Sequence, residues 1–568
     1  MKTTTLILLS IFLTCQGVLS QKNTSFANAM KQIENRGEVY FRFANSKQLD
    51  VTMLGKSISI DHKTDSEWVY AYANRKGFKV FSKQINDFEV LQPPSTLLNP
   101  VMKSEVVLKN TDEWDFYPTY DAYINMMYQF EEDYPELCTI VSFGETVEGR
   151  ELLAARISDN TGDDPGEPQF LYTATMHGDE TAGYVLMLRL INYLLENYAT
   201  DQQVAQLVNH LDIWINPLAN PDGTYHSGNE TVYGSTRYNA NNVDLNRNFH
   251  DPEDGPHPDG NEYQPETLAF MELADDNRFL MAANFHGGFE VFNYPWDTWS
   301  QLHADDDWWQ FTGREWADTV HKYAPSGYFD ELNNGITNGY QWYTTSGSRQ
   351  DYMNYFHHCR EVTLEISTLK LFPPGNLPDL WEYNYRSFLN FMKQSLYGFT
   401  GTVKESWSGN PLEATITLVG HESNNSEMVS NPMDGYFFRP VFEGTYDIKV
   451  NTENSEKIFE SVAIQNYEQI YLDVLLSEED IVSSTTNMVS LGPNPVTDHI
   501  LVYFSNMNTN SFTIAIYTSS GQMICNNSFK PDKTDQTFRI DLPHISPGIL
   551  LIEIEGKDFH ITKKLVKQ

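Results

Sequence analysis

Four short apolar runs that end in polar side chains constrain the fold of this 568-residue chain most strongly. The runs and their polar residues are 169–176 with His177 and Glu180, 211–215 with Asn216, 279–285 with His286, and 361–366 with Glu365. Runs of this length, bounded by turn residues, are typical of buried strands. Ligands of open α/β sheets bind outside the carboxyl ends of the strands, so we expect these side chains to converge.

Amphipathic segments alternate with apolar runs between residues 112 and 397. The clearest predicted helices cover 120–132, 182–198 and 265–275, and Pro265 suits the first position of the last one. This alternation predicts one α/β domain with a mixed, mostly parallel sheet flanked by helices.

The rest of the chain divides into smaller units. Residues 21–108 mix strand-like runs with polar turns, which predicts an N-terminal α+β domain. One hypothesis for this domain is a propeptide. Short alternating segments without helices predict a β-sandwich over 398–476 and a second all-β unit over 491–568. A Ser-, Thr- and acid-rich stretch at 477–490 predicts a linker between them.

The net charge and the N-terminal residues limit which partners and which cellular location we expect. A formal net charge of −39 makes nucleic acid an unsuitable partner, since phosphate binding needs a cationic face. Residues 1–20 have the basic start and short apolar stretch of a secretory signal peptide, with a lipoprotein signal at Cys15 as the alternative. No later stretch reaches the ~18 apolar residues of a membrane span. A Cys138–Cys359 disulfide cannot be deduced from the spacing.

The strand-end residues have the composition of a catalytic zinc site. Two imidazoles and one carboxylate, from His177, Glu180 and His286, leave a fourth tetrahedral position for water. His-x-x-Glu also begins at His250 and His358, but neither follows an apolar run and opens a helix. A strand carboxylate such as Glu365 is more commonly an ion-pair partner, but beside one Zn²⁺ its better role is general base toward water.

The stretch 237–249 places several Asn side chains around Arg237 and Arg247. It is either a hydrophilic loop with Asn in turns or a receptor for a carboxylate, which guanidinium grips in a bidentate manner. Beside a zinc site, a carboxylate receptor indicates an exopeptidase acting at a free C-terminus.

These residues resemble the zinc carboxypeptidase family, particularly its regulatory branch (carboxypeptidases D, E, M and N). The motifs, all in family order between residues 112 and 397, are HGDE at 177–180, NPDG at 220–223, NNVDLNRNF at 241–249, FHGG at 285–288, YPWD at 294–297, ITNGYQWY at 336–343 and RQDYMNY at 349–355. The resemblance implies the zinc ligands His177, Glu180 and His286, the catalytic Glu365, the oxyanion-stabilising Arg237, the carboxylate-holding Asn246 and Arg247, and the mobile Tyr343.

The same resemblance implies a preference for C-terminal Lys or Arg. Asp297 matches the aspartate that meets a basic side chain in this branch, and Gln350 matches its companion. The branch usually reads Gly-Gly-Met before that glutamine, whereas this chain reads Gly347-Ser-Arg349. We expect an arginine beside the pocket either to weaken the preference for basic residues or to neutralise Asp297.

The outer units also carry resemblances. Residues 398–476 resemble the transthyretin-like domain of the branch, and 491–568 resemble a type IX secretion sorting domain, with a fibronectin-like module as the alternative. The chain is therefore expected to be a monomeric metallocarboxypeptidase, secreted or held at the cell surface by the type IX machinery. The alternatives are a zinc amidase acting on cell-wall peptides or acyl-amino acids, and an inactive surface-binding module.

Overall fold

The computed structural model describes most of the chain. The described residues are 25–45, 51–63, 67–108, 114–161, 167–477, 488–492, 496–505, 511–518, 521–530, 536–545, 547–556 and 560–567. The predicted signal peptide at 1–20 lies outside them, as do residues 478–487 of the predicted linker. Strand β22 begins at Met488, so the last residues of that predicted linker belong to a strand.

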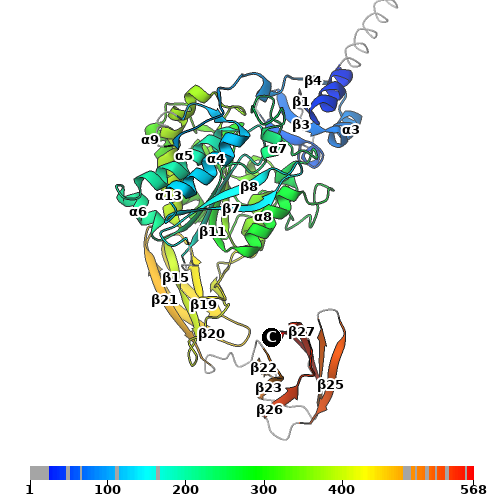
Figure 1. The fold of residues 1–568 in the computed structure, drawn as a ribbon, viewed down its shortest axis with the longest axis vertical. Helices are drawn as coiled ribbons and strands as arrows, with labels where there is room; N and C mark the ends of the chain where they lie inside the picture. Colours follow the sequence, from blue (N-terminus) through cyan, green and yellow to red (C-terminus); the bar gives the residue numbers. More distant parts are fainter. Residues whose placement is uncertain are drawn as a thin grey trace, which may run out of the picture. The chain divides into compact units, whose positions relative to one another are not determined.

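An eight-stranded sheet forms the centre of the molecule, with strand order β13-β12-β14-β11-β9-β10-β8-β7 (Figure 1). The strands are β7 Cys138–Glu145, β8 Glu151–Ile157, β9 Gln169–Ala174, β10 Asp212–Asn216, β11 Phe279–His286, β12 Phe289–Tyr294, β13 Ile336–Asn338 and β14 Arg360–Ser367. Pairing is parallel from β14 through β11 and β9 to β10, and antiparallel where β8, β7 and β12 join. The predicted mixed, mostly parallel sheet is confirmed.

The central strands are buried on both faces, which explains why their sequences read as continuous apolar runs. In β9, Phe170 and Tyr172 enter one hydrophobic cluster, while Leu171 between them enters another. The larger cluster holds residues of α4, α5, α9 and α13, and the smaller one holds residues of α8 and α12. Helices therefore cover both faces of the sheet.

The helices of this domain are α4 Tyr120–Asp133, α5 Ala182–Asn197, α6 Gln202–Val208, α7 Pro221–Thr224, α8 Pro265–Asp276, α9 Asp306–Tyr323, α10 Glu331–Gly335, α11 Gly339–Trp342, α12 Arg349–Phe356 and α13 Leu377–Gln394. The three helices with predicted bounds correspond to α4, α5 and α8. Local chemistry fixes several starts: Thr119 caps α4 through the backbone N–H of Ala122, and Pro265 occupies the first turn of α8. None of the described helices is long and apolar enough to span a membrane.

The N-terminal α+β unit is an antiparallel four-stranded sheet, ordered β2-β3-β1-β4, with its own apolar cluster. Its elements are β1 Glu38–Ala44, α2 Val51–Gly55, β2 Ser59–Lys63, β3 Trp68–Asn74, α3 Arg75–Gln84 and β4 Phe88–Val90. Phe78 and Phe81 of α3 are fully buried against Phe41 of β1. The unit therefore has a small hydrophobic core of its own.

Two sheets make the sandwich that follows the central domain: β18-β15-β21 and β17-β16-β19-β20. Its strands are β15 Gly398–Glu405, β16 Thr415–Leu418, β17 Met428–Val429, β18 Tyr436–Arg439, β19 Gly444–Asn451, β20 Glu456–Ile464 and β21 Gln469–Leu476. A buried ion cluster joins it to the central domain, where Asp305 accepts hydrogen bonds from Arg360 and from Arg439 of β18. The predicted all-β unit is confirmed.

The last unit, residues 481–568, is compact by itself. It contains the sheets β22-β23-β26 and β25-β24-β27-β28. The strands are β22 Met488–Gly492, β23 His499–Ser505, β24 Phe512–Thr518, β25 Met523–Phe529, β26 Gln536–Asp541, β27 Gly548–Gly556 and β28 His560–Lys567. Cys138 and Cys359 are both free and buried, and they belong to different apolar clusters of the central domain.

Candidate metal and substrate site

Three buried side chains converge at the ends of β9 and β11. His177 Nδ1 lies 2.9 Å from Glu180 Oε1, and His286 Nδ1 lies 2.8 Å from Glu180 Oε2. The ligand atoms of all three residues lie within 4.8 Å of one another. The convergence expected from the strand ends is therefore present for these three residues, whereas Asn216, at the end of β10, does not line the site and donates to Leu153 O.

The donor set fits a cation such as zinc. His177 Nδ1 and His286 Nδ1 are only 3.0 Å apart, so at least one of them must present a lone pair rather than a proton. Both also lie within hydrogen-bond distance of the Glu180 carboxylate, so nitrogen and oxygen ligand atoms are gathered in one small volume. Two imidazoles and one carboxylate are the ligands of many catalytic zinc sites.

The turn that carries His177 is fixed by tight backbone packing. A Cβ on Gly178 would come within 2.4 Å of the backbone at Gly223, so the HGDE and NPDG motifs meet where only glycine fits. Asn220 accepts a hydrogen bond from Gly223 N and donates to Met176 O. Contact between the two motifs therefore fixes the turn that carries His177 and Glu180.

Burial and charge shift the pKa values in this cluster. Burial lowers the pKa of His286 to about 4, which favours the neutral imidazole that a metal needs. Burial alone would raise the pKa of Glu180, but His177, Lys370 and His286 together hold it well below its usual range. The Glu180 carboxylate is therefore ionised.

Glu365 lies directly beside His286, because the two are paired in register between β11 and β14. Its side chain lines the same small pocket as the His–Glu–His cluster, and its Oε2 is buried without a hydrogen-bond partner among the described residues. Burial, followed by the charge of Glu180, raises the pKa of Glu365 to about 8. Among the described residues, no ion pair includes Glu365, which favours the role of general base over that of a structural ion-pair partner.

The predicted anion-binding residues line this pocket as well. Arg237, Asn246 and Arg247 all contribute to its wall. Arg237 donates from Nε to Asp244 Oδ2 at 3.0 Å, and Asp244 Oδ1 lies 3.1 Å from His177 Nε2. Sequence reasoning missed Asp244, although it is the carboxylate inside the Asn-rich stretch that separates the two arginines.

The residues predicted to close over the substrate and to select its side chain lie at the same pocket. Tyr343 and Asp297 line the pocket, and Gln350 donates from Nε2 to Asp297 Oδ1 at 3.2 Å. Arg349 points elsewhere: its Nε donates to Glu361 at 2.9 Å, and its guanidinium carbon lies 5.1 Å from the centre of the Phe270 ring. Arg349 is therefore paired inside the protein.

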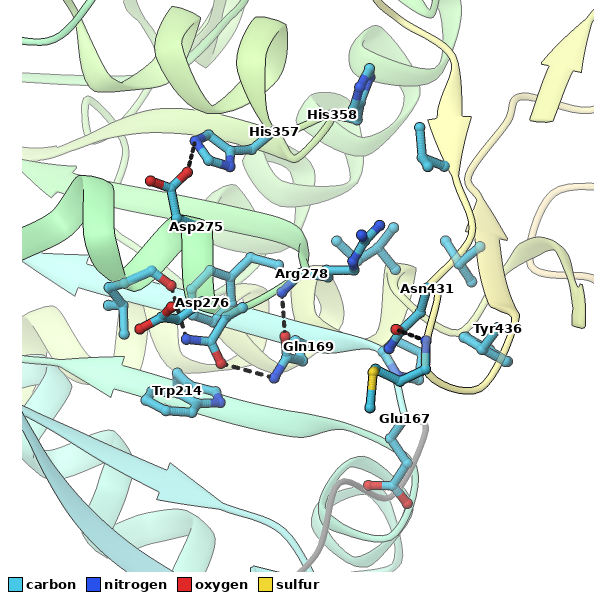
Figure 2. Close-up of a pocket in the computed structure, with 18 of the residues that line it drawn as sticks. Glu167, Gln169, Trp214, Asp275, Asp276, Arg278, His357, His358, Asn431 and Tyr436 are labelled. Carbon is cyan, nitrogen blue, oxygen red and sulfur yellow. Dashed lines mark hydrogen bonds and ion pairs between the residues drawn. The ribbon is translucent and has the colours of Figure 1, made fainter. Parts of the chain in front are cut away.

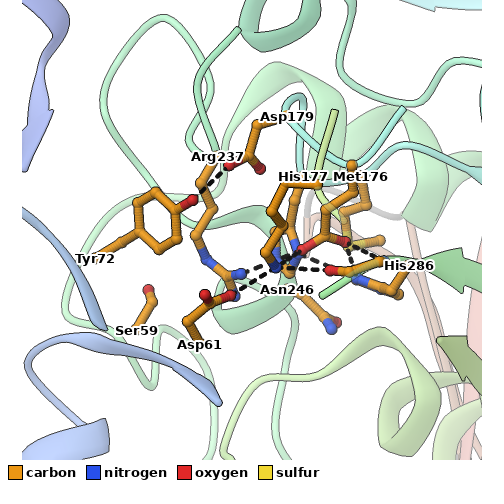
Figure 3. Close-up of polar contacts among 12 residues, drawn as sticks. Ser59, Asp61, Tyr72, Met176, His177, Asp179, Arg237, Asn246 and His286 are labelled. Atoms are coloured by element: carbon orange, nitrogen blue, oxygen red, sulfur yellow. Dashed lines mark hydrogen bonds and ion pairs between the residues drawn. The ribbon is translucent and has the colours of Figure 1, made fainter. Parts of the chain in front are cut away.

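The N-terminal unit reaches into the site from one side (Figure 3). Ser59 Oγ donates to Asp244 Oδ2, Tyr72 donates to Asp179, and Asp61 pairs at 2.6 Å with Lys370, which also contacts Glu180. The cavity left at the cluster measures about 20 Å³. That volume holds about one water molecule and no peptide.

A larger cavity, of about 740 Å³, lies elsewhere, at the beginnings of β9 and β11 and against the sandwich (Figure 2). Trp214 and Arg278 line it from the central domain, and Tyr436 lines it from β18. It contains none of the site residues described above.

Comparison with known proteins is consistent with this arrangement. Residues 123–387 match the family model described as zinc carboxypeptidase, and residues 490–568 match that of a secretion system C-terminal sorting domain. Mouse carboxypeptidase M is 33% identical over 352 residues, which is 60% of this chain and 78% of that protein. The catalytic chain of human carboxypeptidase N is 33% identical over 370 residues, covering 58% of this chain and 79% of that protein.

The chain belongs to the zinc carboxypeptidase family. Zinc is thus its cofactor, and the His177–Glu180–His286 cluster is the place in the described part of the chain that can hold it. Human carboxypeptidase D is 34% identical over 400 residues, or 65% of this chain, but the chain spans only 27% of that protein's length.

A solved structure of carboxypeptidase A from Helicoverpa armigera shares 18% identity with a TM-score of 0.48, covering 62% of this chain and 96% of that one. The C-terminal sorting domain indicates that the chain is secreted or displayed at the cell surface.

Proposed function

We propose that this chain is a secreted zinc metallocarboxypeptidase that hydrolyses the last peptide bond of peptides or proteins. The observation that carries the proposal is that the metal-ligand cluster, a buried carboxylate and two arginines line one pocket. A metal centre alone would suit many hydrolases, but the arginines beside it suit a substrate with a free carboxylate.

Each residue has a proposed role. Zinc, held by His177, Glu180 and His286, supplies Lewis acidity toward water and the scissile carbonyl. Glu365 takes a proton from the attacking water and passes it to the leaving amine. Arg237 stabilises the developing oxyanion. The terminal carboxylate is held by Asn246 and Arg247, and Tyr343 closes over the bound substrate.

We further propose that the enzyme prefers C-terminal Lys or Arg. Asp297 is buried in the pocket wall, where a carboxylate would pair with a cationic side chain and repel an acidic one. The pairing of Arg349 with Glu361 supports this preference, because it leaves the guanidinium unavailable to Asp297.

The N-terminal unit, residues 21–108, is proposed to be a propeptide that keeps the site closed. Its contacts from Ser59, Asp61 and Tyr72 fall on residues around the metal cluster, and the remaining volume admits no substrate. Activation then requires cleavage of the chain between this unit and the catalytic domain at 112–397.

The proposed order of the remaining units is a transthyretin-like sandwich at 398–476, a linker at 477–490 and a sorting domain at 491–568. We propose that the last unit directs the chain through type IX secretion and that the catalytic part acts as a monomer. Its substrates are then peptide and protein C-termini outside the cell.

One pair of peptides tests the proposed function. A peptide ending in Arg with a free carboxylate should lose that residue when treated with the cleaved, zinc-loaded protein, and the same peptide with a C-terminal amide should not. Hydrolysis of the amide would instead favour the zinc amidase. No hydrolysis of either peptide by protein that contains zinc would favour the inactive surface-binding module.

A further inference from the structure

Three buried carboxylates lie together at the proposed specificity pocket, and none forms an ion pair with a cation of the described residues. Asp251, Asp297 and Asp351 are 1%, 6% and 0% exposed. The ion pairs among the described residues include none of the three. Burial raises the pKa of Asp297, and Arg247 is the cation that opposes this rise. Buried charge without a counter-ion is costly unless something compensates for it.

Asp351 holds the loop that carries Asp297. Both carboxylate oxygens of Asp351 accept from the backbone N–H of Asp297, at 3.0 and 3.1 Å, and one of them also accepts from Thr298 N at 2.8 Å. Asp351 lies in the first turn of α12, whose cap residue Ser348 accepts from Asp351 N. The Asp297 loop is thereby fixed to a helix N-terminus rather than left to its own conformation.

Asp251 fixes the same region from the other side. Its carboxylate accepts from Gly347 N at 2.8 Å and from Thr298 Oγ1 at 3.4 Å. Burial raises the pKa of Asp351 well above its usual range, and the charges of Asp297 and Asp251 raise it further. The three carboxylates therefore influence one another.

The three carboxylates do not form a metal site. Among the described residues, the His177–Glu180–His286 cluster alone brings three ligand atoms close enough to share an ion. The oxygens of Asp351 are engaged by backbone N–H groups, while Asp297 faces the pocket with support from Asn293 and Gln350. A cationic side chain entering the pocket would meet Asp297, whose backbone N–H is held by Asp351.

We propose that Asp351 is a positioning residue for basic specificity: by accepting from the backbone N–H groups of Asp297 and Thr298, it orients Asp297 toward a cationic C-terminal side chain. This inference rests on the proposed carboxypeptidase function and assigns a residue beyond Asp297 and Gln350 to the selection of substrate.

The test compares wild-type protein with Asp351→Asn, an isosteric change that removes the charge and one acceptor oxygen. Both are full-length, zinc-loaded and cleaved at a protease site inserted between Leu108 and Trp114. Two peptides that differ only in a final Arg or Leu are hydrolysed, and kcat and KM are measured for each. Asp297→Asn serves as the reference for complete loss of the direct contact.

The proposal predicts that the Arg-over-Leu ratio of kcat/KM falls at least about tenfold in D351N, mainly through a higher KM for the Arg peptide. If Asp351 had only a structural role, D351N would lower kcat/KM for both peptides by the same factor. An unchanged Arg-over-Leu ratio would therefore overturn the inference. If D351N does not retain zinc, Asp351→Glu takes its place. It keeps the carboxyl group but moves it by one methylene, so the Arg-over-Leu ratio should again fall, and an unchanged ratio would overturn the inference. If wild-type protein hydrolyses neither peptide, the proposed function fails, and this inference fails with it.

Discussion

His286 and Glu365 are direct partners in the parallel pairing of β11 with β14. Side chains of paired residues in neighbouring strands point to the same face of a sheet, so this register alone sets a proposed metal ligand beside a buried carboxylate. Glu180 contacts His286 from the turn after β9, the next strand over. The proposed chemistry thus depends on the alignment of three adjacent strands.

Replacing Glu365 with Gln should lower kcat by about 10²- to 10⁴-fold, the usual contribution of a general base. The side chain keeps its shape, and Glu365 is not one of the proposed ligands, so the zinc content should not change. Steady-state kinetics and metal analysis of the cleaved protein check both statements. An E365Q protein with full activity would remove Glu365 from the mechanism.

Replacing Arg247 with Gln should raise KM for free-acid peptides by at least about tenfold, because a charge-assisted contact with the substrate carboxylate is lost. The cleaved protein should then discriminate less between a peptide acid and its amide. Kinetics with the matched acid and amide give the answer. Unchanged discrimination in R247Q would mean that another group holds the chain end.

Replacing Asp61 with Ala should weaken the closure of the uncleaved protein. Asp61 pairs with Lys370 at 2.6 Å, and its loss leaves that buried ammonium with one carboxylate fewer. Activity without cleavage should therefore rise, whereas Asp87→Ala, which changes an exposed acid of the same unit, should have no effect. Equal activity of D61A and wild type before cleavage would argue against the propeptide.

Closure should also depend on pH through Glu38. This carboxyl accepts from Arg237 N across the boundary between the units, and burial, with a smaller contribution from Asp179, raises its pKa from 4.5 to about 8, against the opposing effect of Arg36. The closed state therefore binds the proton more tightly, and raising the pH from about 5 to 8 should weaken closure. Below pH 4.5 Glu38 is protonated in both states and adds no further change.

The measurement is the rate at which an added protease cleaves the N-terminal unit from the full-length chain at several pH values, relative to an unstructured peptide with the same cleavage site. In wild-type protein this ratio of cleavage rates should rise with pH. In the E38Q protein the ratio should depend on pH much less. A ratio that falls with pH in the wild type would contradict the role of Glu38.

The sequence predicts the part of the site that lies close to the strand ends. The four apolar runs become β9, β10, β11 and β14, and His177, Glu180, His286 and Glu365 converge as expected. Asn216, at the end of β10, does not line the site and donates to Leu153 O instead. Periodicity suffices here because a buried parallel sheet leaves few alternatives for where a strand stops.

Contacts between distant units could not be predicted in the same way. Asp61 and Ser59 lie in a strand whose pattern indicates only a small sheet, and nothing in that pattern specifies which surface the sheet will dock against. The direction of Arg349 was equally open, because the choice between Asp297 and Glu361 depends on the packing of α12 against β14. Such outcomes are decided by tertiary packing rather than by local sequence.

Replacing Asp305 with Ala should destabilise the central domain and the sandwich by about 3–5 kcal/mol, because it leaves Arg360 and Arg439 buried without this partner. Denaturant unfolding of the full-length chain measures the loss. Since Asp305 joins the central domain to the sandwich, the two should also unfold less cooperatively. A change below about 1 kcal/mol would mean that the cluster contributes specificity of docking rather than stability.

Zinc analysis of the purified full-length protein tests the central claim most directly, since it needs neither cleavage nor a known substrate. The account predicts about one zinc per chain in wild-type protein and loss of that zinc in His286→Ala, with E365Q still loaded. A wild-type protein that binds no zinc, or a folded H286A protein that retains it fully, would contradict the account.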